Sequence, residues 1–336
     1  MPNVDYHETT TPTPTSAPVE IIAVAANELG LPVFVRCLTE MMRMEQCKAE
    51  PCIFRKMVNS KVSLMVGVHV DDIIVSGESD VCDELFSELK DIFPIKHQGE
   101  LKMYTGCAFE RDWENGALKI NQKAFAENVI TQYGITSVSN IPASPGVDLG
   151  PRVEGETGGN EEFGDYRALV GSLMCMSVMT RPDMANALRA CAGHSHNPTA
   201  PHWKALLQIA TYVNAAKEVD VRFVRGFDLR LSVFAIADYA AASNDRRTVS
   251  GVAVGLGDTA ISWNISTQKC VTTTTCEAEY YVSLCDAAKE AIFERAVLVF
   301  LQPQLVRMCI DIFSDNEGAM AIDRKQPKQC VEKQAY

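Results

Sequence analysis

The chain has 336 residues, 47% hydrophobic and 22% charged, so its length and composition allow two or three globular domains of ordinary size. Its formal net charge of −12 excludes a strongly basic nucleic-acid-binding protein, because affinity for phosphates rests on Lys and Arg. Residues 1–32 carry −4 and residues 147–165 carry −5, which leaves −3 for everything else. The rest of the chain is therefore only mildly acidic, which permits nucleic-acid binding without indicating it.

The cysteines and the apolar stretches limit the class of protein further. Twelve cysteines are scattered without a Cys-x-x-Cys pair or a histidine spacing typical of zinc, which predicts core thiols in a reducing compartment. The first apolar stretch is interrupted by Asn27, Glu28 and Pro32, and no stretch reaches the ~20 apolar residues of a spanning helix. We therefore expect a soluble intracellular protein, cytoplasmic or nuclear, with no signal peptide and no membrane segment.

The N-terminal part of the chain predicts a tail followed by a hairpin. Residues 1–32, with Thr-Pro-Thr-Pro-Thr at positions 11–15, have the composition of a disordered tail. Asp71 and Asp72 then stand between two apolar, β-branched runs, which predicts a β-hairpin with both acids at its tip. Two adjacent negative charges repel, and Mg²⁺, which carboxylates hold together with substrate phosphates, would remove that repulsion. The pair therefore suggests phosphoryl or nucleotidyl transfer, and the alternative is a plain polar turn.

Two helices and an acidic linker follow the hairpin. Apolar residues recur at helical spacing from Val81 to Phe93, and Pro94 ends the pattern, which predicts an amphipathic helix packed on the hairpin. A second helix is expected over Gln122 to Gln132, closed by Gly134. Residues 144–162 are rich in Gly, Pro and acid and are interpreted as a linker.

Residues 163–225 show helical periodicity, and their methionines are expected to fill the core. His194, His196 and His202 have no carboxylate or thiolate at helical ligand spacing. We therefore expect them to face solvent or cap helices and not to bind a metal.

The apolar period changes to two from Leu231 onward. Three strands are expected at Leu231 to Asp238, Thr248 to Leu256 and Ala260 to Ile265. A long helix follows, a fourth strand is expected at Met308 to Phe313, and a short helix is expected at Gly318 to Arg324, so the predicted order is βββαβα. The apolar face expected for the long helix consists of Ala278, Val282, Cys285, Ala288, Ile292, Ala296 and Val299.

Three acids stand at element ends in this unit: Asp238, Glu279 and Asp315. Strand ends and helix starts meet at one edge of such sheets, so these carboxylates could converge around two Mg²⁺ ions that activate water for attack on a phosphodiester. The alternative is two turn residues and one acid favoured by the helix dipole. Glu277 completes a capping box with Thr274, which gives it a structural role at the start of the helix.

Distinctive motifs follow one another in a fixed order over roughly residues 33 to 325. In the first part these are Pro51-Cys52-Ile53-Phe54, Val70-Asp71-Asp72-Ile73 and Gly99-Glu100-Leu101 through Gly106. In the middle they are Tyr166-Arg167-Ala168-Leu169-Val170-Gly171-Ser172-Leu173, Thr180-Arg181-Pro182-Asp183, His196-Asn197-Pro198 and His202-Trp203-Lys204-Ala205. In the last part they are Asp245-Arg246-Arg247-Thr248-Val249-Ser250-Gly251, Ile261-Ser262-Trp263, Glu277-Ala278-Glu279-Tyr280, Ala287-Ala288-Lys289-Glu290 and Ser314-Asp315-Asn316. With these motifs the chain strongly resembles the C-terminal half of a copia-type LTR retrotransposon polyprotein.

The resemblance implies a reverse transcriptase that uses dNTPs and Mg²⁺ or Mn²⁺, and a ribonuclease H that cuts RNA in an RNA/DNA hybrid. It assigns Asp71 and Asp72 to the polymerase site and Asp238, Glu279 and Asp315 to the ribonuclease site, as catalytic residues and metal ligands. The implied fold class is α+β and α/β. It comprises a tail at 1–32, a polymerase palm remnant with helices at 33–143, the linker at 144–162, a helical connecting region at 163–225, a truncated RNase H-like βββαβα domain at 226–325, and a tail at 326–336.

The chain departs from the family pattern at several positions. His69 stands where the family usually has Tyr, and Ile236-Ala237-Asp238 stands where it commonly has Asp-Ala-Asp with the metal-binding acid first. Ile236 and Asp238 share a strand face but lie ~6.6 Å apart, so Asp238 is expected to replace the missing acid only in part.

The family also uses an earlier palm Asp, the fingers, and a later His and Asp, none of which is recognised between Met1 and Tyr336. We therefore expect a reverse transcriptase/RNase H fragment that binds metal weakly and has weak or no activity. The alternative is a non-catalytic module that binds nucleic acid or protein.

Overall fold

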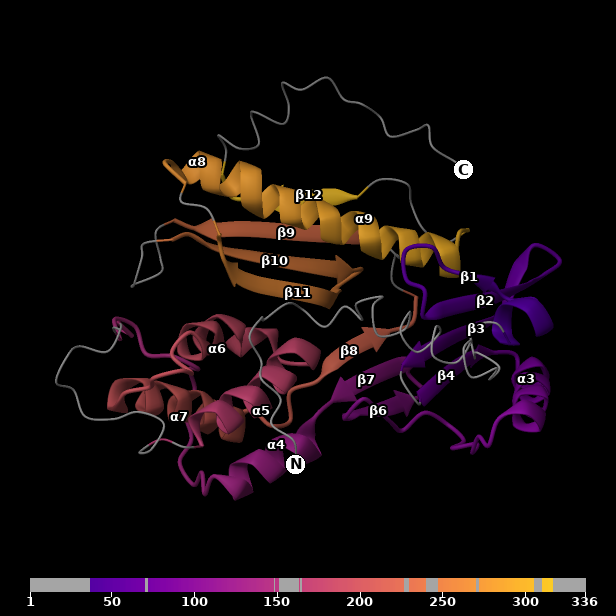
Figure 1. Cartoon of the computed structure of the whole chain (residues 1–336), viewed down its shortest axis with the longest axis horizontal. Helices are drawn as coiled ribbons and strands as arrows, with labels where there is room; N and C mark the ends of the chain where they lie inside the picture. The colour runs from indigo at the N-terminus through magenta and orange to yellow at the C-terminus, as the bar shows by residue number, and fades with distance from the viewer. Residues whose placement is uncertain are drawn as a thin grey trace, which may run out of the picture. The chain divides into compact units, whose positions relative to one another are not determined.

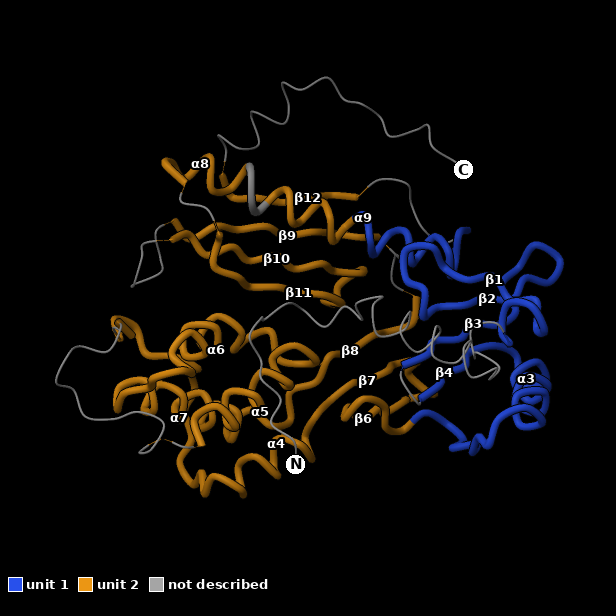
Figure 2. The backbone as a smooth tube through the Cα atoms, viewed as in Figure 1, with its two compact units in different colours: residues 1–101, 292–306 blue, residues 102–291, 307–336 orange. Residues whose placement is uncertain are grey.

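The computed structural model describes residues 37–69, 72–147, 149–150, 163, 165–226, 230–239, 247–269, 272–304 and 310–316 (Figure 1). The chain divides into two compact units, which Figure 2 shows in two colours. Unit 1 comprises Met1–Leu101 and Ile292–Val306, and unit 2 comprises Lys102–Ala291 and Arg307–Tyr336. Both units contain helices and sheets, as the sequence predicts. The expected N-terminal tail, and most of the expected linker, lie outside the described residues.

Unit 1 is an antiparallel sheet with one helix packed against it. Its elements are the π-helical turn η1 (Cys37–Met41), strands β1 (Glu45–Gln46), β2 (Ile53–Val58), β3 (Lys61–His69) and β4 (Asp72–Gly77), and helix α3 (Ser79–Ile92). The strands lie in the order β1-β2-β3-β4. The helix buries Leu85 and Leu89 against the sheet residues Phe54, Leu64 and Val66. The predicted hairpin and the helix that packs on it are therefore confirmed.

Unit 2 contains a helical core beside a second antiparallel sheet. The helices are α4 (Lys123–Gln132), α5 (Tyr166–Met179), the 3₁₀ turn η2 (Pro182–Met184), α6 (Ala185–Ala192) and α7 (Ala200–Ala215). The sheet has the order β5-β6-β7-β8, with β5 (Met103–Tyr104), β6 (Cys107–Asp112), β7 (Ala117–Asn121) and β8 (Val221–Val224). The second predicted helix is confirmed as α4, and Gly134 follows it with a φ of +60°.

The prediction of helical structure over 163–225 is correct for α5 to α7 and wrong at its end. Residues Val221–Val224 form β8, which pairs antiparallel with β7. The strand is four residues long, and its partner lies about a hundred residues earlier in the chain. A segment this short adopts the strand conformation because it pairs with the edge of β7, and its own apolar periodicity is too brief to predict it.

His202 caps a helix, as one of the two predicted alternatives states, but it does not face solvent. Its Nδ1 accepts the backbone N–H of Thr199 at 3.0 Å, and the two residues form the capping box of α7. The side chain is buried, and its ring stacks on His194 with 3.8 Å between centroids. The imidazole is thus part of the packed helical core.

The C-terminal sheet of unit 2 has the order β11-β10-β9-β12. Its strands are β9 (Leu231–Asp238), β10 (Val249–Leu256), β11 (Thr259–Thr267) and β12 (Asp311–Ser314). The first three are antiparallel neighbours, and β12 runs parallel to β9. The segments α8 (Thr275–Glu277), η3 (Ala278–Ser283) and α9 (Leu284–Leu301) connect β11 towards β12, and α9 passes from unit 2 into unit 1 at Ile292. The predicted order of three strands, a helix and a fourth strand is confirmed, whereas the expected helix at 318–324 lies outside the described residues.

The buried face predicted for the long helix is correct at Ala278, which is 0% exposed, and wrong along α9. Cys285 is exposed and Ile292 is 65% exposed, whereas the buried residues of α9 are Ala287 and Ala291. The reason is η3, a π-helical stretch at the start of the helix. A π-helix has i→i+5 hydrogen bonds and more residues per turn, so every later residue is rotated away from the face that an ideal period predicts.

Candidate catalytic carboxylates

Asp72 lies at the start of β4, where the hairpin of unit 1 closes. It is directly opposite His69 in the strand register, and its side chain is exposed. The apolar runs on both sides favour strands, and their inward residues cover the core under α3. Asp71 lies outside the described residues, so the geometry of the acidic pair stays a prediction.

Asp238 is the last residue of β9, and its side chain is exposed. Burial alternates along β9, so that Phe234, Ile236 and Asp238 share the face opposite to the buried Val233 and Ala235. This agrees with the expected placement of Ile236 and Asp238 on one face. The Asp238 carboxylate also acts on Arg189 of α6, where it opposes the lowering of the Arg189 pKa by burial.

Glu279 lies in η3 and is 3% exposed, which makes it a buried acid of the C-terminal sheet region. Its Oε1 accepts the backbone N–H of Ala237 at 2.6 Å, and this bond joins the helix entry to β9. Its Oε2 is buried and has no hydrogen-bond partner among the described residues. Burial raises the pKa of Glu279, the bond from Ala237 opposes that shift, and the negative charge of Asp315 adds to it.

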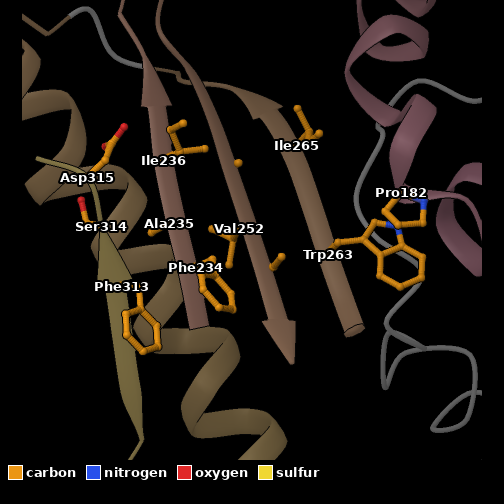
Figure 3. Close-up of a pocket in the computed structure, with 12 residues that line it drawn as sticks. Pro182, Phe234, Ala235, Ile236, Val252, Trp263, Ile265, Phe313, Ser314 and Asp315 are labelled. Atoms are coloured by element: carbon orange, nitrogen blue, oxygen red, sulfur yellow. The ribbon is translucent and has the colours of Figure 1, made fainter. Parts of the chain in front are cut away.

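Asp315 follows β12 directly and is exposed. Because β12 is parallel to β9, the chain leaves β12 on the side of the sheet edge where β9 also ends. The close-up in Figure 3 shows Asp315 and Ile236 near the same end of the sheet face. The structure therefore brings Glu279 within electrostatic range of Asp315 and into contact with the backbone next to Asp238.

Glu277 has the capping role that the sequence predicts. Its backbone N–H donates to Thr274 Oγ1 at 3.1 Å, and its Oε2 accepts the backbone N–H of Thr273 at 2.7 Å. The bonds that its carboxylate accepts from the backbone N–H and the hydroxyl of Thr273 hold the pKa of Glu277 below its usual range. In the usual capping box the carboxylate accepts the backbone N–H of the N-cap residue. Here the N-cap residue is Thr274, and the carboxylate of Glu277 accepts the N–H of the preceding residue, Thr273.

The residues present fit a divalent cation only in part. The open Oε2 of Glu279 and the nearby charge of Asp315 suit a hard cation, which prefers carboxylate oxygens. The side chain at position 236 offers no ligand, and within the described parts of the chain no three His, Cys, Asp or Glu residues gather as a metal site. The described geometry is therefore not a complete two-metal centre.

Sequence reasoning missed two features of this region. The first is Arg189, which lies on α6, some fifty positions before Asp238. Its guanidinium donates to Thr267 Oγ1 at 2.9 Å and interacts electrostatically with Asp238. The π-helical stretch that carries Glu279 was also missed. Neither has a local signal, since the first depends on helix packing against β11 and the second on the tertiary position of the helix entry.

The comparisons with known proteins agree with the motifs. A family model described as Reverse transcriptase (RNA-dependent DNA polymerase) matches residues 32–145. The Pol polyprotein of transposon TNT 1-94 from Nicotiana tabacum is 27% identical over 74% of this chain, and that of transposon RE2 from Arabidopsis thaliana is 27% identical over 75%. Residues 32–145 thus match a reverse transcriptase domain, and about three quarters of the chain is similar to copia-type Pol polyproteins.

The Pol relatives are much longer than this chain. The chain spans about a fifth of their length, 19% of the first and 17% of the second. An uncharacterized mitochondrial protein of Arabidopsis thaliana is 25% identical over 66% of this chain, which covers 91% of that protein. No solved structure matches this chain significantly. None of the described helices is long and apolar enough to cross a membrane.

Proposed function

We propose that this chain is a reverse transcriptase/RNase H part of a copia-type Pol polyprotein whose RNase H-like centre has lost efficient cleavage. The ancestral activity is RNA-directed DNA synthesis from dNTPs, together with cleavage of RNA in RNA/DNA hybrids. Mg²⁺ or Mn²⁺, held by carboxylates, would act as a Lewis acid on the phosphate in both reactions and would favour deprotonation of the attacking oxygen, which is the primer 3′-hydroxyl in synthesis and water in cleavage. The carboxylates Asp71 and Asp72 are proposed for the first reaction, and Asp238, Glu279 and Asp315 for the second.

The observation that carries this proposal is the topology around Glu279. Three antiparallel strands, a helix and a fourth strand parallel to the first place a buried acid of the helix entry against the end of β9. Burial of a carboxylate with an unpartnered oxygen costs free energy that a purely structural side chain avoids. We interpret Glu279 as a ligand retained from a metal-dependent centre.

The loss of efficiency is proposed from position 236. Ile236 is 54% exposed on the same face as Asp238, so an acid there would meet no packing obstacle from the core. Asp238 lies one full strand period away from Ile236, and it also faces the cation Arg189. Without a third acid in the right position, Glu279 and Asp315 would bind the metal ion weakly. The site would then bind an RNA/DNA hybrid more effectively than it cleaves it.

The test is to restore the missing acid. Ile236→Asp in the full chain should raise Mn²⁺-dependent cleavage of an RNA/DNA hybrid well above the native chain, because the carboxylate supplies the absent ligand. Ile236→Asn is the matched control, since it has the same shape without the charge. Glu279→Gln in the Ile236→Asp background should abolish the gain, whereas Glu277→Gln should mainly lower the melting temperature.

Two results would contradict the proposal. Cleavage in the Ile236→Asn chain equal to that in the Ile236→Asp chain would show that a new carboxylate is not what the centre lacks. A gain that survives Glu279→Gln and disappears in Glu277→Gln would reverse the roles of the two glutamates.

A further inference from the structure

One arginine of helix α6 reaches the C-terminal sheet at the end of β11. The helix lies beside this strand (Figure 1), and Arg189 in its last turn donates through Nη1 to Thr267 Oγ1 at 2.9 Å. The Nε of Arg189 donates to Asn186 Oδ1 at 3.2 Å, one helical turn earlier. These two bonds hold the guanidinium against the last residue of β11.

The strand register places Thr267 at the same end of the sheet as the candidate catalytic acid Asp238. Val249 of the central strand β10 is paired with Asp238 on one side and with Thr267 on the other. Paired residues of adjacent strands point to the same face of a sheet, and two strand spacings amount to about 10 Å. Thr267 and Asp238 therefore flank Val249 on one face, with Arg189 bonded to the first of them.

This end of the face also carries Asp315. Figure 3 shows Asp315 near the same end as Ile236 of β9 and Ile265 of β11, beside an apolar pocket that these residues line. Arg189 interacts electrostatically with Asp238. A cation contributed by α6 thus lies at the sheet end where the candidate ribonuclease acids gather.

The guanidinium of Arg189 has hydrogen-bonding capacity to spare. The side chain is half-buried, and it forms no ion pair with the acids of the described residues. An arginine carries five N–H donors, and the bonds to Asn186 and Thr267 use two of them. A charge held partly out of water without a bonded counter-ion costs free energy, which an anionic ligand would offset.

The chemistry at this sheet end favours a phosphate as that anion. The planar fork of an arginine matches two phosphate oxygens at once. In phosphoryl-transfer sites, arginines and carboxylate-held cations together bind the phosphate group on which the reaction takes place. Arg189 stands beside acids that are proposed to hold such a cation, so its free N–H groups suit a phosphate of the nucleic-acid backbone.

We propose that Arg189 binds a phosphate of the RNA/DNA hybrid beside Asp238, through the guanidinium N–H groups that Asn186 and Thr267 leave free. The inference rests on the proposed function, because it names the substrate group that the candidate ribonuclease centre meets on the side of α6. It gives α6 a direct part in binding the hybrid, whereas the carboxylates would hold the metal ion.

Hybrid binding by the full chain tests the proposal without requiring cleavage. Fluorescence anisotropy of a labelled RNA/DNA hybrid, with Ca²⁺ in place of Mg²⁺, gives the affinity over a series of KCl concentrations. Arg189→Gln should weaken binding about ten-fold at low salt, because a charge-assisted bond is lost. It should also reduce the slope of log affinity against log salt by about 1. Arg189→Lys keeps the charge without the fork, so it should give an intermediate affinity with the native slope.

Two further variants separate phosphate binding from a general charge effect and from a structural role. Arg167→Gln removes an exposed arginine of α5 that donates to Ser195 O at 2.8 Å, and it should keep the native affinity and slope. Thr267→Val removes one acceptor of Arg189 but leaves its charge in place, so it should weaken binding less than Arg189→Gln does. Melting temperatures of all variants report whether the fold is kept.

Three results would overturn the proposal and leave the proposed function standing. The first is an Arg189→Gln chain with native affinity and slope. The second is an equal loss of affinity in Arg189→Gln and Arg167→Gln, which would show a general charge effect. The third is an equal fall in melting temperature for Arg189→Gln and Thr267→Val with native affinity in both, which would show that Arg189 only joins α6 to β11.

The remaining outcomes are also decisive. A native chain that binds no hybrid at any salt concentration would contradict the proposed function itself. If Arg189→Gln does not fold, Arg189→Lys decides the question: reduced affinity with the native slope supports phosphate binding, and native affinity overturns it.

Discussion

Asp72 and Glu279 are both acids of candidate catalytic centres, yet their surroundings differ. Asp72 is exposed at the mouth of a hairpin, where water solvates its charge. Glu279 is buried, bonded through one oxygen to Ala237 and unpartnered at the other among the described residues. An exposed acid costs the fold little and is compatible with a plain turn, whereas a buried, half-satisfied acid needs a reason for its retention.

The comparison also separates packing from chemistry. In unit 1 the hairpin is supported by the apolar cluster under α3, to which the exposed Asp72 does not belong. In the C-terminal sheet region the acid itself joins a helix entry to a strand. Substitutions should therefore affect stability in one region through the core and in the other through the carboxylate.

The largest effect is expected in the core of unit 1. Phe54→Ala should lower the free energy of unfolding by about 3–5 kcal/mol, because Phe54 is 0% exposed and its removal leaves a cavity. Urea unfolding followed by circular dichroism measures the change. Val58→Ala, on the same strand and 48% exposed, is the control and should cost far less. A loss below about 1 kcal/mol for Phe54→Ala would show that the hairpin does not depend on this cluster.

The next effect concerns the buried acid and should depend on pH. Glu279→Gln should raise the free energy of unfolding by about 1–2 kcal/mol near pH 8, because a neutral amide is less costly to bury than a carboxylate with an open oxygen.

The sign of that pH dependence follows from the raised folded-state pKa of Glu279. The contribution of Glu279 to the free energy of unfolding is present below the ordinary pKa of a glutamate and is lost as the pH rises through the folded-state pKa. The difference in the free energy of unfolding between the Glu279→Gln chain and the native chain should therefore shrink as the pH falls towards about 4. Thermal unfolding over this range, with Glu290→Gln as control, measures it. A Glu279→Gln chain that is less stable than the native chain at every pH would assign the carboxylate a structural role.

A smaller effect is expected at the helix entry beside Glu279. Thr274→Ala should cost about 1 kcal/mol, because it removes the oxygen that accepts the Glu277 N–H. Thr275→Ala, one position further along, is the matched control and should cost less. Equal losses for the two variants would indicate that the N-cap bond contributes little. Glu277→Gln should lower the melting temperature slightly, since its side chain accepts from Thr273.

The smallest effect is expected at the hairpin mouth. Asp72→Asn, measured without divalent cations, should change the free energy of unfolding by no more than about 0.5 kcal/mol, as is usual for exposed positions. Asp71→Asn is expected to be neutral or mildly stabilising, because it removes a like charge beside Asp72. A clear loss of unfolding free energy in either variant would show that the two acids stabilise the hairpin directly. The contrast drawn between the exposed Asp72 and the buried Glu279 would then be wrong.

The sequence by itself determined the local elements with strong periodicity. The alternation from Leu231 to Asp238 predicted β9 with its observed bounds, and the spacing from Val81 to Phe93 predicted α3, because both patterns are set by which face meets the core. The helix cap formed by Thr274 and Glu277 could also be predicted from the sequence, because its donors and acceptors lie within four residues of one another.

Tertiary structure alone decided the remaining features. The strand β8 exists because β7 offers it an edge, and the buried face of α9 follows from the π-helical stretch before it. The burial of Glu279 and its bond to Ala237 join residues more than forty positions apart. The pocket on the sheet face, lined in part by Gly251 and Ala253, likewise depends on the pairing of three strands. Each depends on contacts between distant residues, whose free energies are not encoded in any local pattern.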